Sequence, residues 1–313
     1  MSKKLLTIFG ATGNQGGSVI STVLASQALS AKYALRAITR DTTKPNAQAL
    51  ASKGVELAKA DLNDPSSIAS AIKGSYGVFA VTNYWETTSK EVEFNQGKNI
   101  VDACKSEGVK HLVWSGLPNT TAMTSGELSR IEHFDSKAQV TDYATKIKGD
   151  SLLVSTFMPG FFMSNLLGQI KRQEDGTIAL SLPWDADKTW LPLLDIRGDT
   201  GKYVAGLFEA GSAADGVAVQ GVSEWVHPAQ IISLVAELSG QDVKFQPQEM
   251  TVEMTNNMDR IPAEMVQNMI LIRDYSYFGK GTEQKQAESD KYVAEGTKLN
   301  NWNSWAKEQK WAW

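Results

Sequence analysis

Near its N-terminus the chain reads Gly10-Ala11-Thr12-Gly13-Asn14-Gln15-Gly16, between an apolar run at residues 4–9 and a helical pattern at 18–29. Glycines at this spacing allow a tight turn and a close approach of the backbone to a ligand. The N-terminus of the following helix offers free N–H groups to a pyrophosphate. A strand, this turn and a helix in that order predict a dinucleotide site. Its expected cofactor-binding residues are Gly10, Thr12, Gly13, Asn14, Gln15 and Gly16.

Strand-like runs continue beyond this turn and alternate with helical segments. The six runs are residues 4–9, 34–39, 55–59, 77–82, 111–114 and 151–156. This alternation predicts an α/β fold of the Rossmann type, a doubly wound parallel sheet with helices on both faces. Later helical patterns at 200–210, 228–239 and 263–277 follow irregular sequence. We therefore expect a dinucleotide-binding Rossmann domain at 1–158 and a smaller α+β substrate-side region at 159–313, partly interleaved with the first.

Composition excludes several classes of protein. The 313 residues carry 31 Lys and Arg against 35 Asp and Glu, a net charge of −4, which disfavours direct nucleic-acid binding. The first apolar run is too short for a membrane span or a signal peptide, so we expect a cytoplasmic protein, or a nuclear one if it regulates transcription. Cys104 is the single cysteine and is expected to be a buried structural thiol.

The end of the second strand decides which dinucleotide is bound. The sequence there is Thr39-Arg40-Asp41-Thr42-Thr43-Lys44. An arginine at this place accepts the 2′-phosphate of NADP, whereas an acid pairs with the ribose 2′-hydroxyl of NAD. Arg40, with Lys44 behind it, favours NADP(H). Asp41 leaves NAD(H) as the less favoured alternative, because its charge repels a phosphate unless it is turned away, and Arg40 and Lys44 could also be a plain solvated pair.

Two further strand ends supply candidate cofactor contacts. Asp61 and Leu62 follow the third strand, where they can meet the adenine edge. Thr82 and Asn83 follow the fourth, where the crevice faces the middle of the cofactor, although Asn83 could instead cap the next loop.

Several motifs together resemble the NmrA-like family of atypical short-chain dehydrogenases/reductases. They are the glycine turn, Thr39-Arg40, the segment His133-Phe134-Asp135-Ser136-Lys137, and residues 157–165 and 275–279. The resemblance spans nearly the whole chain and implies the Rossmann fold and NADP(H) binding. Members of the family include regulators and an NADPH sensor without established turnover as well as true reductases, so the resemblance leaves both functions open.

The superfamily's catalytic tyrosine, with a lysine four residues later, is missing here. None of the eight tyrosines has lysine at that spacing, and His133 stands four residues before Lys137. The resemblance implies that Lys137 contacts the nicotinamide ribose and that Ser115 orients a substrate, although a serine before glycine also forms turns. His133 can replace the tyrosine as proton donor, since imidazole titrates near neutrality. It is equally compatible with a sensor that performs no chemistry.

Aromatic residues surround the expected nicotinamide end. Pro159 begins a turn across it, and Phe161, Phe162 and Met163 are candidates to shield the ring, with ordinary core packing as the alternative. We expect an apolar pocket there that includes Trp184 and Trp190. Another aromatic group, Trp302, Trp305, Trp311 and Trp313, is expected to pack on the body of the protein, with partner docking as the alternative.

Two functions follow from these residues. The favoured one is a redox or cofactor sensor that binds NADP(H) and acts through a regulatory protein partner or a homodimer. The alternative is an NADPH-dependent oxidoreductase that reduces a small carbonyl, quinone, imine or enone. The histidines lack partners at metal-ligand spacing, so we expect no metal site.

Overall fold

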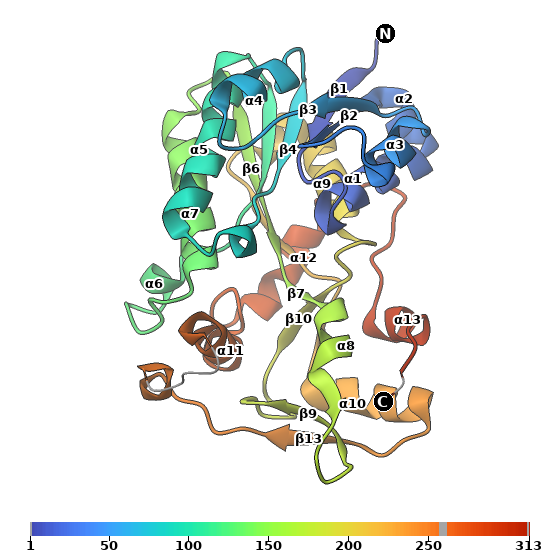
Figure 1. Cartoon of the computed structure of the whole chain (residues 1–313), viewed down its shortest axis with the longest axis vertical. Helices are drawn as coiled ribbons and strands as arrows, with labels where there is room; N and C mark the ends of the chain where they lie inside the picture. Colours follow the sequence, from blue (N-terminus) through green and yellow to red (C-terminus); the bar gives the residue numbers. More distant parts are fainter. Residues whose placement is uncertain (1, 257–261, 312) are drawn as a thin grey trace.

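A seven-stranded parallel sheet forms one half of the molecule (Figure 1). The computed structural model describes residues 2–256, 262–311 and 313. The strands are β1 (Lys4–Ile8), β2 (Tyr33–Thr39), β3 (Glu56–Lys59), β4 (Gly77–Ala80), β5 (His111–Ser115), β6 (Leu153–Pro159) and β11 (Ala218–Gly221). Their order is β3-β2-β1-β4-β5-β6-β11. The direction of winding reverses between β1 and β4, which opens a crevice at the carboxyl ends of these strands.

Helices cover both faces of this sheet, as the alternating pattern predicts. One face carries α4 (Pro65–Ile72), α5 (Lys90–Ser106) and α7 (Glu132–Ile147), and the other carries α1 (Asn14–Ala25), α2 (Gln27–Lys32) and α9 (Thr200–Ala210) (Figure 1). A separate buried apolar cluster lies beneath each layer. Cys104 is fully buried in the first of these layers, which confirms its prediction as a buried residue.

The Rossmann-type fold is confirmed, and all six predicted strands are present with ends shifted by a few residues. The seventh strand, Ala218–Gly221, was not predicted. It adds to β6 in parallel at the edge of the sheet, and α9 packs on α1, so residues 200–221 return to the first half of the chain. The division at residue 158 stays a prediction.

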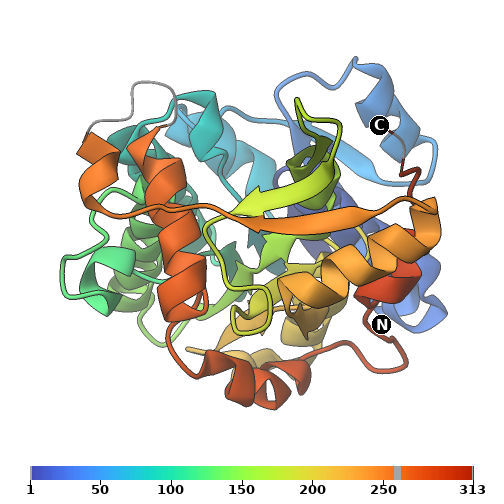
Figure 2. The same cartoon turned by 90° about the horizontal axis from the view of Figure 1, so that it is seen from below.

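A smaller half built from two three-stranded sheets lies at the bottom of Figure 1 and faces the viewer in Figure 2. One sheet has the order β12-β10-β7 and the other β13-β9-β8. Their strands are β7 (Phe161–Phe162), β8 (Ile170–Arg172), β9 (Ile178–Leu182), β10 (Leu191–Leu194), β12 (Glu224–Val226) and β13 (Val243–Pro247). The helices α10 (Pro228–Ser239) and α11 (Ala263–Tyr275) flank them. A third apolar cluster is the core of this half.

Short helices complete the chain. They are α3 (Pro45–Ala51), α6 (Thr120–Met123), α8 (Leu166–Gln169), α12 (Gln286–Asp290), α13 (Trp302–Lys307) and the 3-10 helices η1 (Tyr84–Glu86), η2 (Met163–Asn165), η3 (Gly211–Ala214), η4 (Glu253–Asn256) and η5 (Thr282–Lys285). Within the described residues, no helix is both long and apolar enough to cross a membrane.

The tryptophans at the C-terminus pack on the body of the protein, as expected. Trp302 is buried and its ring stacks on Trp305. The indole of Trp313 donates a hydrogen bond to the carbonyl of Ile170 at 2.9 Å. The tail thereby closes over the smaller half of the molecule.

Candidate functional site

The glycine turn is a cradle into which side chains do not fit. Gly10 has a φ of +62°, and a Cβ there would lie 2.7 Å from the Val81 side chain. A Cβ on Gly16 would lie 2.4 Å from the carbonyl oxygen of Gly10. Helix α1 begins directly afterwards at Asn14, and no side chain caps its N-terminus. The turn thus presents bare backbone and a helix N-terminus to the crevice, which is the arrangement that binds a pyrophosphate.

A cavity of about 550 Å³ opens above this turn, at the carboxyl ends of the central strands. The predicted cofactor residues that line it are Gly10, Thr12, Gly13, Asn14, Gln15, Arg40, Lys44, Asp61, Leu62, Thr82 and Asn83. Gly16 packs beneath the turn, and Pro159 ends β6, where it is in register with Gly221 of β11; neither is among the residues that line the cavity. Predicted cofactor residues that follow four different strands therefore line one cavity.

The residues after β2 are arranged in a way that suits a phosphate. Arg40 is ion-paired with Glu86, and the guanidinium is largely exposed at the mouth of the cavity. Asp41 is turned into its own loop, where its Oδ1 accepts hydrogen bonds from the backbone N–H of Thr43 at 2.9 Å and from the Thr43 hydroxyl at 2.6 Å. These bonds hold the pKa of Asp41 below its usual value. Asp41, the residue that favours NAD(H), is thus hydrogen-bonded to Thr43.

The residues that follow β3 and β4 make different contacts. Asp61 Oδ1 accepts a hydrogen bond from the backbone N–H of Asn63 at 2.9 Å, and Leu62 lies beside it on the cavity wall. Asn83 precedes η1 without making a side-chain cap, so its interpretation as a cap is wrong and its side chain is available to the cavity.

Lys137 forms a buried ion pair with Glu93 behind the cavity wall. Glu93 is 1% exposed on α5. Its Oε1 accepts hydrogen bonds from Lys137 Nζ and, at 2.7 Å, from the hydroxyl of Thr82, while Oε2 accepts one from Ser136. Burial lowers the pKa of Lys137, and Glu93 opposes that effect. Because Thr82 lines the cavity and shares an oxygen atom with Lys137, the ammonium lies one side chain away from the cofactor space.

Ser115 is connected to the cofactor cavity through Gln15. Its buried hydroxyl donates a hydrogen bond to Gln15 Oε1 at 2.7 Å, and Gln15 lines the cavity. The serine therefore supports the glycine turn from below.

His133 faces the second half of the chain. Its Nδ1 lies 2.5 Å from Oε1 of Glu264 on α11, and the same oxygen accepts its backbone N–H at 2.9 Å. Burial opposes ionisation of Glu264, yet the hydrogen bonds from His133 bring the pKa of Glu264 below its usual value. Trp85 packs on the imidazole, with ring centroids 5.1 Å apart. His133 is thus half of a carboxylate–imidazole pair, and its side chain is not among those that line the described cavity.

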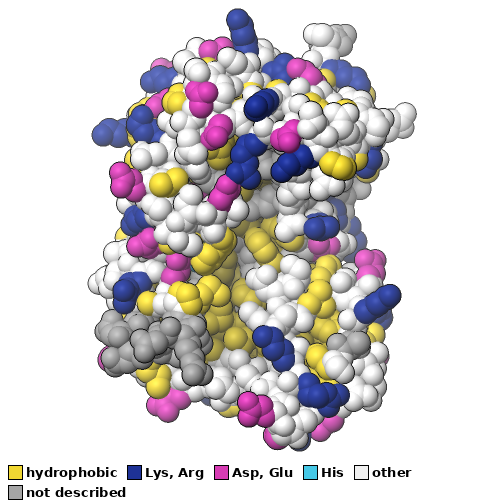
Figure 3. All heavy atoms as spheres, in the orientation of Figure 1, with side chains coloured by type: hydrophobic (Ala, Val, Ile, Leu, Met, Phe, Trp, Pro, Cys, Tyr) yellow, Lys and Arg dark blue, Asp and Glu magenta, His cyan; other side chains and the backbone are white. Residues whose placement is uncertain are grey.

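An apolar hollow lies below the cofactor cavity. Figure 3 shows hydrophobic side chains gathered there, between α11 on one side and α8 on the other. Phe162 lines the cofactor cavity at the start of this region, whereas Phe161 and Met163 are core residues. The expectation that Trp184 lines an open pocket is wrong: the ring is 2% exposed, because it packs on Phe161 and its indole donates to the carbonyl of Met269.

Sequence reasoning missed several residues of this site. Glu86, Gln96 and Ile196 line the cavity, and Glu93 and Glu264 bind the two candidate catalytic side chains. Each glutamate lies far from its partner in sequence, and an isolated glutamate in a helix has no pattern that reveals such a partner. Trp190, predicted for an aromatic pocket, packs on the ring of His227 with centroids 3.8 Å apart.

Comparisons with known proteins agree with this architecture. The model of the NmrA-like family matches residues 2–306. The NmrA-like family domain-containing oxidoreductase lnaB of Aspergillus flavus is 32% identical over 262 residues, which cover 78% of this chain and 76% of that protein. The structure of NmrA, a negative transcriptional regulator in complex with NADP, superposes with a TM-score of 0.78 at 19% identity, covering 98% of this chain and 95% of that one. Citrobacter sp. triphenylmethane reductase complexed with NADP(H) gives 0.70 at 20% identity, covering 96% and 99%. At such identities, the two structures establish a shared fold.

Proposed function

The chain belongs to the NmrA-like family, and we propose that it is an NADP(H)-dependent oxidoreductase that reduces a polarised double bond in a small, largely apolar substrate. The observation that carries the proposal is that one acid–base pair lies directly behind the wall of the cofactor cavity and a second lies one helical turn away from it. Lys137 and Glu93 lie directly behind its wall, and His133 with Glu264 lies one turn earlier on the same helix. The oxidoreductase name of a relative 32% identical supports it.

The cavity suits a dinucleotide that carries a 2′-phosphate. The glycine turn admits no Cβ at Gly16, so the backbone can approach a pyrophosphate closely. Arg40 and Lys44 supply two cations at the other end, and Asp41 is bonded to Thr43. We therefore favour NADP(H) over NAD(H), with Asp61 and Leu62 at the adenine. NmrA is found in complex with NADP and also with NAD, so it supports dinucleotide binding, and the NADP(H) of the triphenylmethane reductase supports the choice of NADP(H).

The residues near the nicotinamide end supply the remaining chemistry. When bound, the reduced nicotinamide supplies a hydride to the substrate carbon. His133 donates the accompanying proton, with Glu264 orienting the imidazole through Nδ1. Lys137, held by Glu93, binds the ribose, and Ser115 steadies Gln15 in the turn. The apolar hollow in Figure 3 favours a carbonyl, quinone, imine or enone with an apolar body.

Cofactor sensing is the second candidate function, and one observation favours it. The ammonium of Lys137 is already bonded to a buried carboxylate, and the superfamily's tyrosine is replaced by His133. A protein of this kind binds NADP(H) without turnover and passes the redox state to a protein partner or a second copy of the chain.

One set of measurements separates these functions. Calorimetric titration with NADP⁺, NADPH, NAD⁺ and NADH gives the cofactor preference, and absorbance of the reduced nicotinamide follows turnover with a carbonyl, quinone, imine and enone panel. The oxidoreductase proposal expects NADPH oxidation that falls in Lys137→Ala and His133→Gln while NADPH still binds. Binding without any turnover, joined to a cofactor-dependent change in assembly, favours the sensor. Absence of dinucleotide binding contradicts both.

A further inference from the structure

The loop between β10 and α9 brings a cation from the smaller half of the molecule to the glycine turn. Ile196 in this loop lines the cofactor cavity. The next residue, Arg197, is exposed, and its Nε donates a hydrogen bond to Oδ1 of Asn14 at 2.8 Å. Asn14 lines the cavity and is the first residue of α1. Among the described residues, no carboxylate lies within ion-pair distance of the Arg197 guanidinium.

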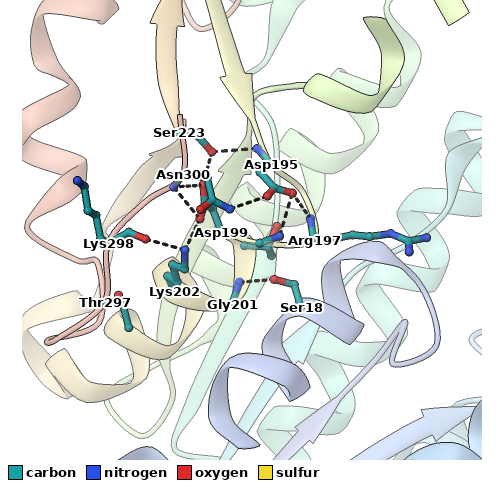
Figure 4. Close-up of polar contacts among 12 residues, drawn as sticks. Ser18, Asp195, Arg197, Asp199, Gly201, Lys202, Ser223, Thr297, Lys298 and Asn300 are labelled. Atoms are coloured by element: carbon teal, nitrogen blue, oxygen red, sulfur yellow. Dashed lines mark hydrogen bonds and ion pairs between the residues drawn. The ribbon is translucent and has the colours of Figure 1, made fainter. Parts of the chain in front are cut away.

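A polar cluster holds the backbone of this loop in place (Figure 4). Asp195 Oδ1 accepts the backbone N–H groups of Arg197 at 3.2 Å and Gly198 at 3.0 Å. Its other oxygen accepts a hydrogen bond from Asn300 Nδ2 at 2.6 Å, and its backbone N–H donates to Ser223 Oγ at 2.9 Å. Figure 4 shows the Arg197 side chain pointing away from this cluster, toward α1. The cluster therefore fixes the loop, and the guanidinium lies outside the cluster, bonded through Nε to Asn14.

Further hydrogen bonds connect this loop to the C-terminal segment. Asp199 is fully buried and accepts hydrogen bonds from the backbone of Asn300, the hydroxyl of Ser223 and Lys202 Nζ. Lys202 Nζ also donates to the carbonyl of Lys298 at 2.7 Å. Three distant parts of the chain thus meet at the base of one short loop.

Helix α9, which follows this loop, contacts α1 directly. The backbone N–H of Gly201 donates to Ser18 Oγ at 2.9 Å, and a Cβ on Gly201 would lie 2.4 Å from the carbonyl oxygen of Ser18. Helices α9 and α1 therefore approach at backbone distance, which fixes the position of Arg197 relative to the N-terminus of α1.

We propose that Arg197 is a phosphate-binding residue that contacts the cofactor pyrophosphate beside Asn14, at the N-terminus of α1. An arginine offers several N–H donors in a fixed plane and matches phosphate oxygens well. The N-terminus of α1 attracts the same negative charge through its backbone, so the two elements act together. The inference rests on the proposed dinucleotide binding and adds that the smaller half of the chain helps to bind the cofactor.

The test compares Arg197→Gln with Arg40→Gln by calorimetric titration of the full chain with NADP⁺ and NAD⁺. Because both dinucleotides share the pyrophosphate, Arg197→Gln is expected to weaken both by the same factor, roughly tenfold. Arg40→Gln is expected to weaken NADP⁺ alone. Arg197→Gln should also weaken ADP, which carries the diphosphate, and leave adenosine, which has none, unchanged. Arg172→Gln is the matched control, since Arg172 is exposed on β8 and bonds only to the carbonyl of Gly176 in the described contacts.

Three outcomes overturn the assignment. If Arg197→Gln binds both dinucleotides as the wild type does, Arg197 has no role in binding while the proposed function stands. If it weakens NADP⁺ alone, the guanidinium serves the 2′-phosphate instead. A wild type that binds no dinucleotide removes both the proposed function and this inference. Thermal unfolding of each variant shows that the loop cluster is intact, and Arg197→Lys is expected to retain part of the affinity.

Discussion

The guanidinium of Arg40 is ion-paired with the carboxylate of Glu86 at the mouth of the cofactor cavity. Arg40 follows β2, and Glu86 ends η1, so the pair links two strand ends across the crevice. A 2′-phosphate bound to Arg40 has to compete with this carboxylate. The side chains are 70% and 48% exposed, and ion pairs in such positions contribute only about 0.2–1 kcal/mol.

Glu86→Gln is therefore expected to tighten NADP(H) binding by about two- to fivefold, which corresponds to removal of an exposed competitor. NAD(H) binding should be unchanged, because it carries no 2′-phosphate. Calorimetric dissociation constants for both cofactors measure the effect, with Glu91→Gln on the exposed face of α5 as control. Equal tightening of both cofactors would show a general charge effect and contradict competition at Arg40.

Gly16→Ala is expected to abolish dinucleotide binding and to destabilise the fold. The added Cβ would meet backbone oxygens of Gly10 at 2.4 Å and Phe9 at 2.6 Å, and backbone cannot move aside as a flexible side chain can. Overpacking of this kind costs about 1–3 kcal/mol. Gly168→Ala is the control, because a Cβ there would have no neighbouring atom within 4 Å and the φ of Gly168 is not positive. Urea unfolding measures the loss of stability, and cofactor titration measures the loss of binding. Wild-type affinity in Gly16→Ala would contradict the requirement for glycine at this position.

The first half of the fold could be predicted because its information is local. Each strand from β1 to β5 is a short run followed by its own crossover helix, so residues 4–147 carry a repeated pattern that leads into β6. The edge strand Ala218–Gly221 has no such neighbour. It joins β6 after an excursion that contributes β7 to β10 to the two small sheets, and tertiary contacts rather than local pattern place it there.

The partners of the candidate site residues could not be predicted, for the same reason. Arg40 and Glu86 are 46 positions apart, Lys137 and Glu93 are 44 apart, and His133 and Glu264 are 131 apart. The glycine turn, in contrast, is one contiguous motif whose chemistry depends on its own backbone. Sequence therefore identified many residues that line the cavity and missed the partners that hold the candidate side chains.

The buried imidazole of His111 makes stability depend on pH. His111 is 0% exposed, its Nε2 lies 2.7 Å from Ser155 Oγ, and burial lowers its pKa to about 4. Between pH 6.5 and 4 the unfolded chain binds a proton that the folded chain does not, so this contribution is present above pH 6.5 and is lost as the pH falls to 4. The loss amounts to about 3 kcal/mol.

His111→Leu should remove this dependence. Urea unfolding at about pH 7 and about pH 4.5, on either side of the unfolded imidazole's pKa, is expected to give a smaller difference in the variant than in the wild type, whatever the other acids contribute to both. The variant leaves Ser155 bonded to the carbonyl of Ala214, which limits its cost at neutral pH. An identical fall in stability for the two proteins would contradict a neutral buried imidazole.

Glu264→Gln is expected to lower turnover without changing cofactor affinity. Glu264 lies outside the lining of the cofactor cavity and orients His133 through Nδ1, so its removal affects proton donation and leaves NADPH binding intact. A decrease in kcat of about tenfold is expected, within the range of general acid catalysis. Glu288→Gln, at an exposed position on α12, is the control. Unchanged kcat in Glu264→Gln would show that the His133–Glu264 pair only joins α7 to α11.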